Sequence, residues 1–159
     1  MMASVVIRPA RLGDISFILH GNVVVDEKSH YQAPDQLSAD RLKRDVFSEN
    51  PRAYIDIAEV DGEAAALVFY SFCYYASEGE GVWITNLYVD PFARKAGLGL
   101  MLVEHLKKKY PKCSGIYGAV ADKNKLARHF FSKIGAIRYE EFVIYGAPND
   151  WGADGKENA

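Results

Sequence analysis

Residues 82–100 run Val82-Trp83-Ile84-Thr85-Asn86-Leu87-Tyr88-Val89-Asp90-Pro91-Phe92-Ala93-Arg94-Lys95-Ala96-Gly97-Leu98-Gly99-Leu100. The first eight residues are rich in β-branched and aromatic types, which predicts a strand ended by Asp90-Pro91. Two glycines follow, and apolar residues at helical spacing then predict a helix over about 97–110. The stretch is therefore a strand, a glycine loop and a helix start in direct succession.

The glycine loop, residues 94–99, has the composition of an anion site. The first amides of a helix lack partners within it, and the helix dipole adds positive charge there. Glycines at 97 and 99 let a diphosphate approach the backbone, and Arg94 and Lys95 add formal charge. Taken alone, the same glycines also fit a tight turn between strand and helix. A Rossmann fingerprint would need Gly where Leu102 stands, and the Gly-Lys-Ser/Thr of a P-loop is absent.

The N-terminal half predicts an antiparallel start to the sheet. Its patterns indicate a strand over 5–8, a helix from Asp14 with Val23 among its inward residues, a loop over 26–36, and a helix capped by Ser38. Two β-rich runs, 53–60 and 64–75, then flank Asp61-Gly62, which is a strong hairpin signal.

The C-terminal half predicts a crossover. A strand over 115–121 follows the helix, so strand, helix and strand form a βαβ unit with parallel pairing. A helix over 124–134 ends at Gly135, and 137–145 supplies one or two short strands. We therefore predict an α/β (α+β) fold of order β-α-α-β-β-β-α-β-α-β-β. Its mixed, mostly antiparallel twisted sheet has six to seven strands, with helices on both faces.

Length and composition indicate one globular domain over 1–146 with a loose tail over 147–159. The 19 basic and 21 acidic residues leave a net charge of −2, which argues against a nucleic-acid partner. The apolar stretch 64–75 is shorter than the ~20 residues of a membrane span, and no signal peptide is evident. We therefore expect a cytoplasmic protein without a membrane partner. Cys73 and Cys113 lack metal-ligand spacing, so we expect neither a metal nor a disulfide.

Two motifs resemble the GNAT superfamily of acetyl-CoA-dependent N-acetyltransferases. The first is Leu87-x-Val89-x-Pro91 followed by Arg94-x-x-Gly97-x-Gly99, which is similar to the family's R/Q-x-x-G-x-G/A signature after a strand. The second is the block N-x-x-A-x-x-x-Y-x-x-x-G, matched by Asn124, Ala127 and Gly135, with Phe131 in place of Tyr. The resemblance covers about residues 4–146. The opening I-R-P-A and the aromatic run 69–75 look like the diamine and polyamine acetyltransferase branch.

The resemblance implies direct attack of an amine on the thioester of acetyl-CoA, with no metal. The Leu87 backbone would polarise the carbonyl, and Val89 would pair with the pantetheine amides. Cofactor contacts are expected at Leu87, Tyr88, Val89, Arg94, Lys95, Ala96, Gly97, Leu98, Gly99, Leu100, Asn124, Ala127 and Phe131.

The acceptor side departs from the polyamine branch. That branch has acidic residues where this chain has Thr85 and Asn86, which cannot act as bases, so Asn86 could only position a water. Phe131 keeps the volume of the family's Tyr and donates nothing, and Tyr139 is one candidate substitute. Glu27, Tyr31, Thr85 and Glu140 are predicted substrate contacts. Other carboxylates near the acceptor site, which surface solvation also explains, are Asp26, Glu78, Glu80 and Glu141.

These expectations describe a homodimeric enzyme that acetylates a small primary amine. Two alternatives stay open. One is a non-catalytic module with the same fold that binds an acyl-CoA or a partner protein. The other is an N-acetyltransferase whose acceptor is a protein or peptide.

Overall fold

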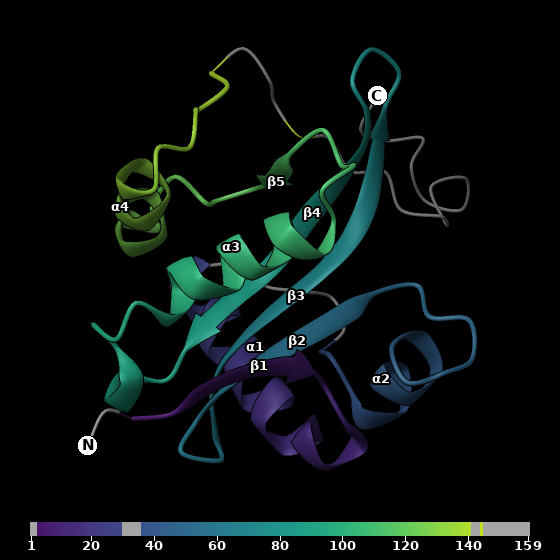
Figure 1. The fold of residues 1–159 in the computed structure, drawn as a ribbon, viewed down its shortest axis with the longest axis vertical. Helices are drawn as coiled ribbons and strands as arrows, with labels where there is room; N and C mark the ends of the chain where they lie inside the picture. The colour runs from purple at the N-terminus through teal and green to yellow at the C-terminus, as the bar shows by residue number, and fades with distance from the viewer. Residues whose placement is uncertain (1–2, 30–35, 141–143, 145–159) are drawn as a thin grey trace, which may run out of the picture.

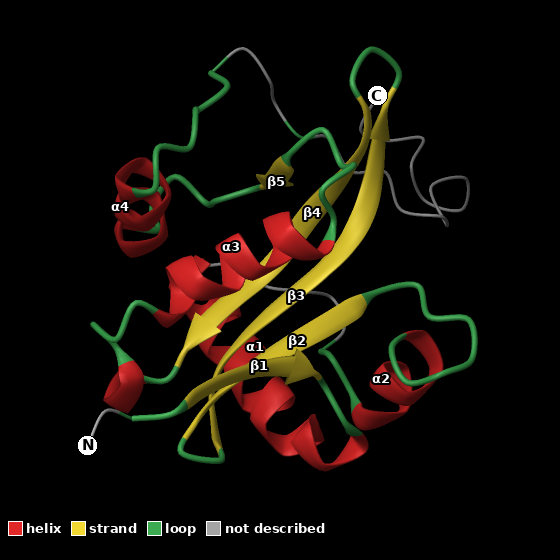
Figure 2. Ribbon diagram, in the orientation of Figure 1, coloured by secondary structure: helices red, strands yellow, loops and turns green. Residues whose placement is uncertain are grey.

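A computed structural model describes residues 3–29, 36–140 and 144. Its five strands form one sheet in the order β1-β2-β3-β4-β5. They are β1 (Val5–Pro9), β2 (Tyr54–Val60), β3 (Glu63–Tyr75), β4 (Gly79–Val89) and β5 (Ile116–Gly118). The first four pair antiparallel, and β5 pairs parallel to β4. Figure 2 shows β3 and β4 as a long twisted ribbon through the middle of the molecule.

Helices cover both faces of this sheet (Figure 1). The 3-10 turn η1 (Leu12–Asp14) leads into α1 (Ile15–Ser29), and α2 (Ala39–Asp45) follows. The 3-10 turn η2 (Pro91–Ala93) precedes α3 (Leu98–Lys109), and α4 (Lys125–Lys133) follows β5. The predicted order therefore holds from β1 to α4, including the hairpin and the parallel crossover.

Two apolar cores lie on the two faces of the sheet. On one face, Leu102 and Leu106 of α3 pack against residues such as Val68. On the other, Ile18 of α1 packs with residues that include Leu67. Val68 and Leu67 are neighbours on β3, and their opposite directions follow from the alternation of side chains along a strand.

Two predictions about the chain's course need correction. The loop expected over 26–36 begins later, because α1 continues to Ser29, and the sequence has no Gly or Pro between Gly21 and Pro34. Val23, predicted to face inward, is 44% exposed. Leu37 and Leu42, in contrast, both join the α1-side core.

The prediction of six to seven strands is also wrong for the described chain, which has five. Residues 137–140 form no strand, and Ile137 and Tyr139 remain exposed. Residues 141–143 and 145, which complete that predicted segment, lie outside the described residues, as do Tyr31 and the tail 147–159.

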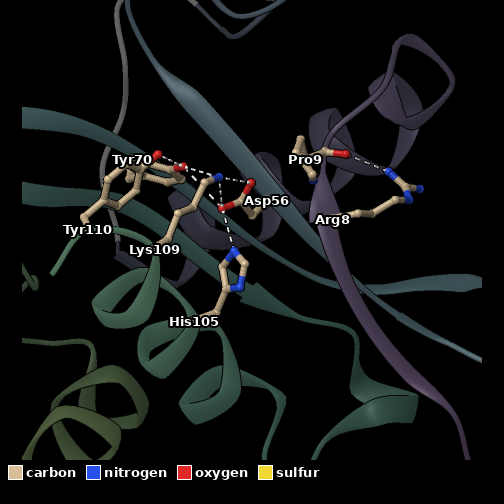
Figure 3. A network of polar contacts seen from close by, with 7 residues as sticks. All are labelled: Arg8, Pro9, Asp56, Tyr70, His105, Lys109 and Tyr110. Atoms are coloured by element: carbon tan, nitrogen blue, oxygen red, sulfur yellow. Dashed lines mark hydrogen bonds and ion pairs between the residues drawn. The ribbon is translucent and has the colours of Figure 1, made fainter.

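A buried carboxylate ties the C-terminal half of α3 to the sheet (Figure 3). Asp56 of β2 is 1% exposed and accepts hydrogen bonds from Lys109 Nζ at 2.9 and 3.1 Å. Its Oδ2 also lies 3.2 Å from both Tyr70 Oη and His105 Nε2. Tyr70 Oη is 2.8 Å from Tyr110 Oη, and burial raises the pKa of Tyr70. The sheet thus holds α3 by charge as well as by apolar packing.

A second ion-pair cluster fixes the start of the chain. Arg8 of β1 donates to Asp14 at 2.7 and 3.0 Å and to Glu59 at 2.6 Å. A further bond to the Pro9 carbonyl is 3.1 Å long (Figure 3). The hydrogen bonds from Arg8 hold the pKa of Asp14 below its usual range. The cluster joins β1, η1 and β2 at the entry to α1.

No helix within residues 3–29 and 36–140 has the length and apolar character needed to cross a bilayer. Within the same residues, no group of three or more His, Cys, Asp or Glu side chains is placed to hold a metal ion. Cys73 and Cys113 are both free thiols.

The buried Asp56 network makes a prediction about stability. Asp56→Asn removes the charge that Lys109 and Tyr70 face, and the amide presents a donor to those donors. We expect a loss of about 2 kcal/mol in the free energy of unfolding, measured by urea denaturation. Glu63→Gln, an equal charge change at the exposed first residue of β3, is the control and should stay within about 0.5 kcal/mol of the parent protein. Equal midpoints for the two variants would contradict a stabilising role for Asp56.

Candidate functional site

A β-bulge interrupts the long ribbon inside the stretch that decides the fold. Phe69 of β3 pairs with Asn86 of β4, whereas the next residue, Tyr70, pairs with Ile84. Thr85 is therefore one extra residue on β4, and its hydroxyl donates to the Phe69 carbonyl at 3.0 Å. A bulge of this kind bends a strand and shifts its hydrogen-bonding alternation by one residue.

The bulge leaves the end of β4 with an unpaired edge. Before it, Val82 directs its amide to β5, donating to the Gly115 carbonyl at 3.0 Å. After it, Asp90 donates to Ala65 of β3, so by alternation Tyr88 and Asn86 bond to β3, and the residues between them face away.

The strand β5 does not follow β4 beyond the bulge. The pairing between them ends at Ile84. The amide and carbonyl groups of Leu87 and Val89 consequently face the side that β5 has left, and no described residue pairs with them. We call the backbone of these two residues the free edge.

The glycine loop stands next to the free edge and carries unpaired amides. Ala96 donates to the Ala93 carbonyl at 3.4 Å, and the first bond of α3 runs from Met101 to Gly97. In the part of the chain that the structure describes, no acceptor meets the remaining five amides, those of Lys95, Gly97, Leu98, Gly99 and Leu100. Leu98 and Gly99 are also buried, and a buried helix start without partners calls for an acceptor from outside.

Different physical constraints require glycine at the two positions of the loop, 97 and 99. Gly97 has a φ of 75° with open space around it, so its backbone conformation requires glycine. Gly99 has no such requirement, and a Cβ there would lie 3.1 Å from the Phe130 ring of α4. We expected Gly99 to admit a diphosphate. The structure gives Gly99 a packing role as well, because the Phe130 ring lies where a Cβ would be and glycine lets α4 approach the first turn of α3.

The second predicted motif forms the start and body of α4. Asn124 is the N-cap, with Oδ1 accepting from the Ala127 amide at 3.1 Å. Phe131 is half-buried, with its ring centroid 5.3 Å from that of Phe130. The capping bond accounts structurally for Asn124 and for the short distance to Ala127. It neither requires nor opposes a role for them in ligand binding.

The face of β4 that packs against α1 carries a chain of polar side chains. Asn86 Nδ2 donates to Asn22 Oδ1 on α1 at 2.8 Å, and Asn22 Nδ2 donates to Asp26 Oδ2 at 3.0 Å. Burial raises the pKa of Asp26, against the opposing hydrogen bond from Asn22. We call these three residues the Asp26–Asn22–Asn86 chain. It links the neutral Asn86 of β4 to a carboxylate on α1, Asp26, which the sequence offered as one of several acidic residues near the acceptor site.

Several predicted site residues lie elsewhere. Tyr88 bonds to β3 through its backbone, and its ring is buried under α1, so the free edge does not include it. Tyr139 is 54% exposed and lies near Tyr117. Glu140 is exposed, 3.6 Å from Arg138, and Glu27 is exposed on α1.

Four other predicted residues lie at the free edge or in the glycine loop beside it. Leu87 and Val89 supply the free edge, and Arg94 and Lys95, both exposed, flank the unpaired amides. Sequence reasoning named Asp26 and Asn86 separately, but it missed Asn22 and the hydrogen bonds that join the three side chains. Asn22 and Asp26 stand four residues apart, which is the spacing of neighbours on one helix face, but the predicted loop over 26–36 hid that signal.

Comparisons with known proteins agree with this geometry. The model of the acetyltransferase (GNAT) family matches residues 22–136. Thialysine N-epsilon-acetyltransferase of Sus scrofa is 30% identical over 148 residues, 85% of each chain.

Two solved structures share the fold. One is a predicted acetyltransferase with acetyl-CoA from Clostridium acetobutylicum, with a TM-score of 0.70 and 18% identity over 90% of this chain and 96% of that one. The other is an aminoglycoside acetyltransferase from an uncultured soil metagenomic sample in complex with sisomicin. Its TM-score is 0.69, with 12% identity over 91% of this chain and 95% of that one. The family match covers well over half of the chain, and this protein therefore belongs to the acetyltransferase (GNAT) family and is an N-acetyltransferase.

Proposed function

We propose that this protein transfers the acetyl group of acetyl-CoA to a primary amine of a small molecule. The observation that carries the proposal is the free edge of Leu87 and Val89 beside five unpaired amides of the glycine loop. An extended amide-bearing chain pairs with a free strand edge, and a diphosphate binds unpaired amides at a helix start. Pantetheine and the diphosphate of coenzyme A have these two chemistries in one molecule.

The residues of this chain fit that ligand in a definite way. Lys95, Gly97 and Leu98 would hold the diphosphate through their amides, with Arg94 adding charge at the surface. Leu87 and Val89 would pair with the pantetheine amides, and an unpaired amide at this edge would polarise the acetyl carbonyl. Acetyl-CoA supplies the activated acetyl group as a thioester.

The overall reaction converts acetyl-CoA and an alkylammonium ion into an N-acetylamine, coenzyme A with a free thiol, and one proton. The ammonium must lose a proton before its nitrogen can attack, because its pKa of ~10.4 keeps it charged at neutral pH. Phe131 cannot protonate the departing thiolate. A thiol of pKa ~8.5 is a tolerable leaving group as its anion, so this absence does not make the protein inert.

The relatives and the face of β4 support a proposal for the acceptor class. The porcine relative is named for thialysine, a small amino acid with a primary amine, and one solved structure holds the aminoglycoside sisomicin. Thr85 and Asn86 are neutral, so this face lacks the two carboxylates that would pair with a long polycation. We propose an acceptor with one reacting amine, such as a lysine analogue.

The first prediction concerns the donor. Acetyl-CoA at a hundredfold excess over its Kd should stabilise the protein by ~2.7 kcal/mol, seen as a rise in Tm. Gly97→Val should abolish most of that rise, because a side chain and a changed backbone there disrupt the amides. Gly79→Val is the matched control, since Gly79 also has a positive φ of 90° and open space but lies in the β3–β4 turn. An equal rise in both variants would contradict the assignment of the diphosphate to the glycine loop.

The second prediction concerns the acceptor. Release of free thiol from acetyl-CoA should be faster with thialysine or lysine than with spermidine or with a peptide amine. Thr85→Glu adds a carboxylate at the exposed bulge and should raise the ratio of spermidine to thialysine turnover severalfold. A wide preference of the parent protein for spermidine would refute the proposed acceptor. Binding of acetyl-CoA without turnover of any amine would favour the non-catalytic module.

A further inference from the structure

The Asp26–Asn22–Asn86 chain has a fixed hydrogen-bond direction. An ionised carboxylate only accepts, so Asn22 must offer its NH2 group to Asp26, and its oxygen then accepts from Asn86. This order leaves Oδ1 of Asp26 and Oδ1 of Asn86 as acceptors without a donor among the described residues. Neither is a buried unpaired atom, so both are accessible to solvent.

The chain is held at the bulge by tight packing of α1 on β4. A Cβ at Gly21 would lie 2.8 Å from the Tyr88 ring, so glycine allows α1 its close approach one residue before Asn22. Asn86 itself stands between the bulge residue Thr85 and the free edge at Leu87. The two free acceptor oxygens thus lie on the α1 side of β4, the strand whose free edge would hold acetyl-CoA.

The surroundings of Asp26 favour binding of a cation. Its neighbours on α1, Glu27 and Lys28, are exposed and are not hydrogen-bonded to it, and His20 packs its ring against Tyr88. Burial raises the pKa of the Asp26 carboxyl, and the hydrogen bond from Asn22 lowers it. No described cation forms an ion pair with it. A partly buried carboxylate without a cation is a site where an ammonium ion gains a charge-assisted hydrogen bond.

We infer that the Asp26 carboxylate binds the acceptor's ammonium group and receives its proton, with Asn22 and Asn86 as positioning residues. This inference rests on the proposed function and supplies the base that Thr85 and Asn86 cannot provide. In the step, one N–H bond of the ammonium breaks and its electron pair stays on nitrogen. The proton bonds to a carboxylate oxygen, which leaves a neutral amine and a carboxylic acid. Asp26 then returns its proton to water before the next turnover.

The test compares three variants with thialysine as the acceptor. Asp26→Asn keeps the shape of the side chain and removes the base, and we expect kcat/KM at pH 7 to fall about 100-fold. Its kcat/KM should then rise tenfold per pH unit toward the amine's own pKa, whereas the parent protein levels off earlier. Asp26→Glu should restore the levelling-off. Asp40→Asn, an equal charge change on exposed α2, should leave the profile unchanged, and the Kd of acetyl-CoA should be the same in all variants.

A binding measurement separates this inference from the proposed function. Thialysine added without acetyl-CoA should shift the side-chain amide signals of Asn22 and Asn86 in nuclear magnetic resonance spectra of the parent protein, and not in those of Asp26→Asn. If the parent protein turns over and Asp26→Asn has the same pH profile, the inference is wrong and the function stands. If the parent protein shows no turnover, the proposed function fails. The amide signals then decide for or against an amine site at Asp26.

Discussion

The extra residue at Thr85 is the constraint on which both sides of the site depend. Without it, the alternation set by Val82 would continue, and the groups of Asn86 and Tyr88 would face the side of β5. With it, Leu87 and Val89 present their backbone at the free edge. The same shift directs the Asn86 side chain toward α1, where it meets Asn22. One inserted residue therefore creates an unpaired edge and a polar side-chain contact on the opposite face.

The helix α3 is supported differently at its two ends. Near its C-terminal end, Lys109 and His105 meet the buried Asp56, so that end is fixed to β2 by charge. At its N-terminal end the amides of Leu98 and Gly99 have no described partner, although both residues are buried. The polar contacts with Asp56 therefore lie at the C-terminal end of α3, which is remote from the proposed ligand. The end nearest the free edge keeps its hydrogen-bonding capacity for a molecule from outside.

Local patterns were sufficient for most of the fold. The strand, glycine loop and helix of 82–109 and the hairpin at Asp61-Gly62 each depend on neighbouring residues, and all were predicted. The β-bulge was not, because no composition distinguishes Thr85 as an inserted residue. The contact of Asn22 with Asn86 spans 64 positions and that of Asp56 with Lys109 spans 53, so only the packed fold reveals them. Gly99 shows a further limit, since the sequence could not reveal that the Phe130 ring of another helix also lies beside it.

The free edge has a consequence for how such a protein diverges. Leu87 and Val89 would bind the donor through their peptide groups, which every residue except proline can provide. Their side chains only need to pack against the core beneath α3. Asp26, Asn22 and Asn86 would instead act through their side chains, so a replacement there would alter what they bind. Evolution can therefore rewrite the choice of acceptor from the α1 face while inheriting the donor site unchanged. Under this proposal the two halves of the reaction are encoded differently, the donor half in main-chain groups and the acceptor half in side chains.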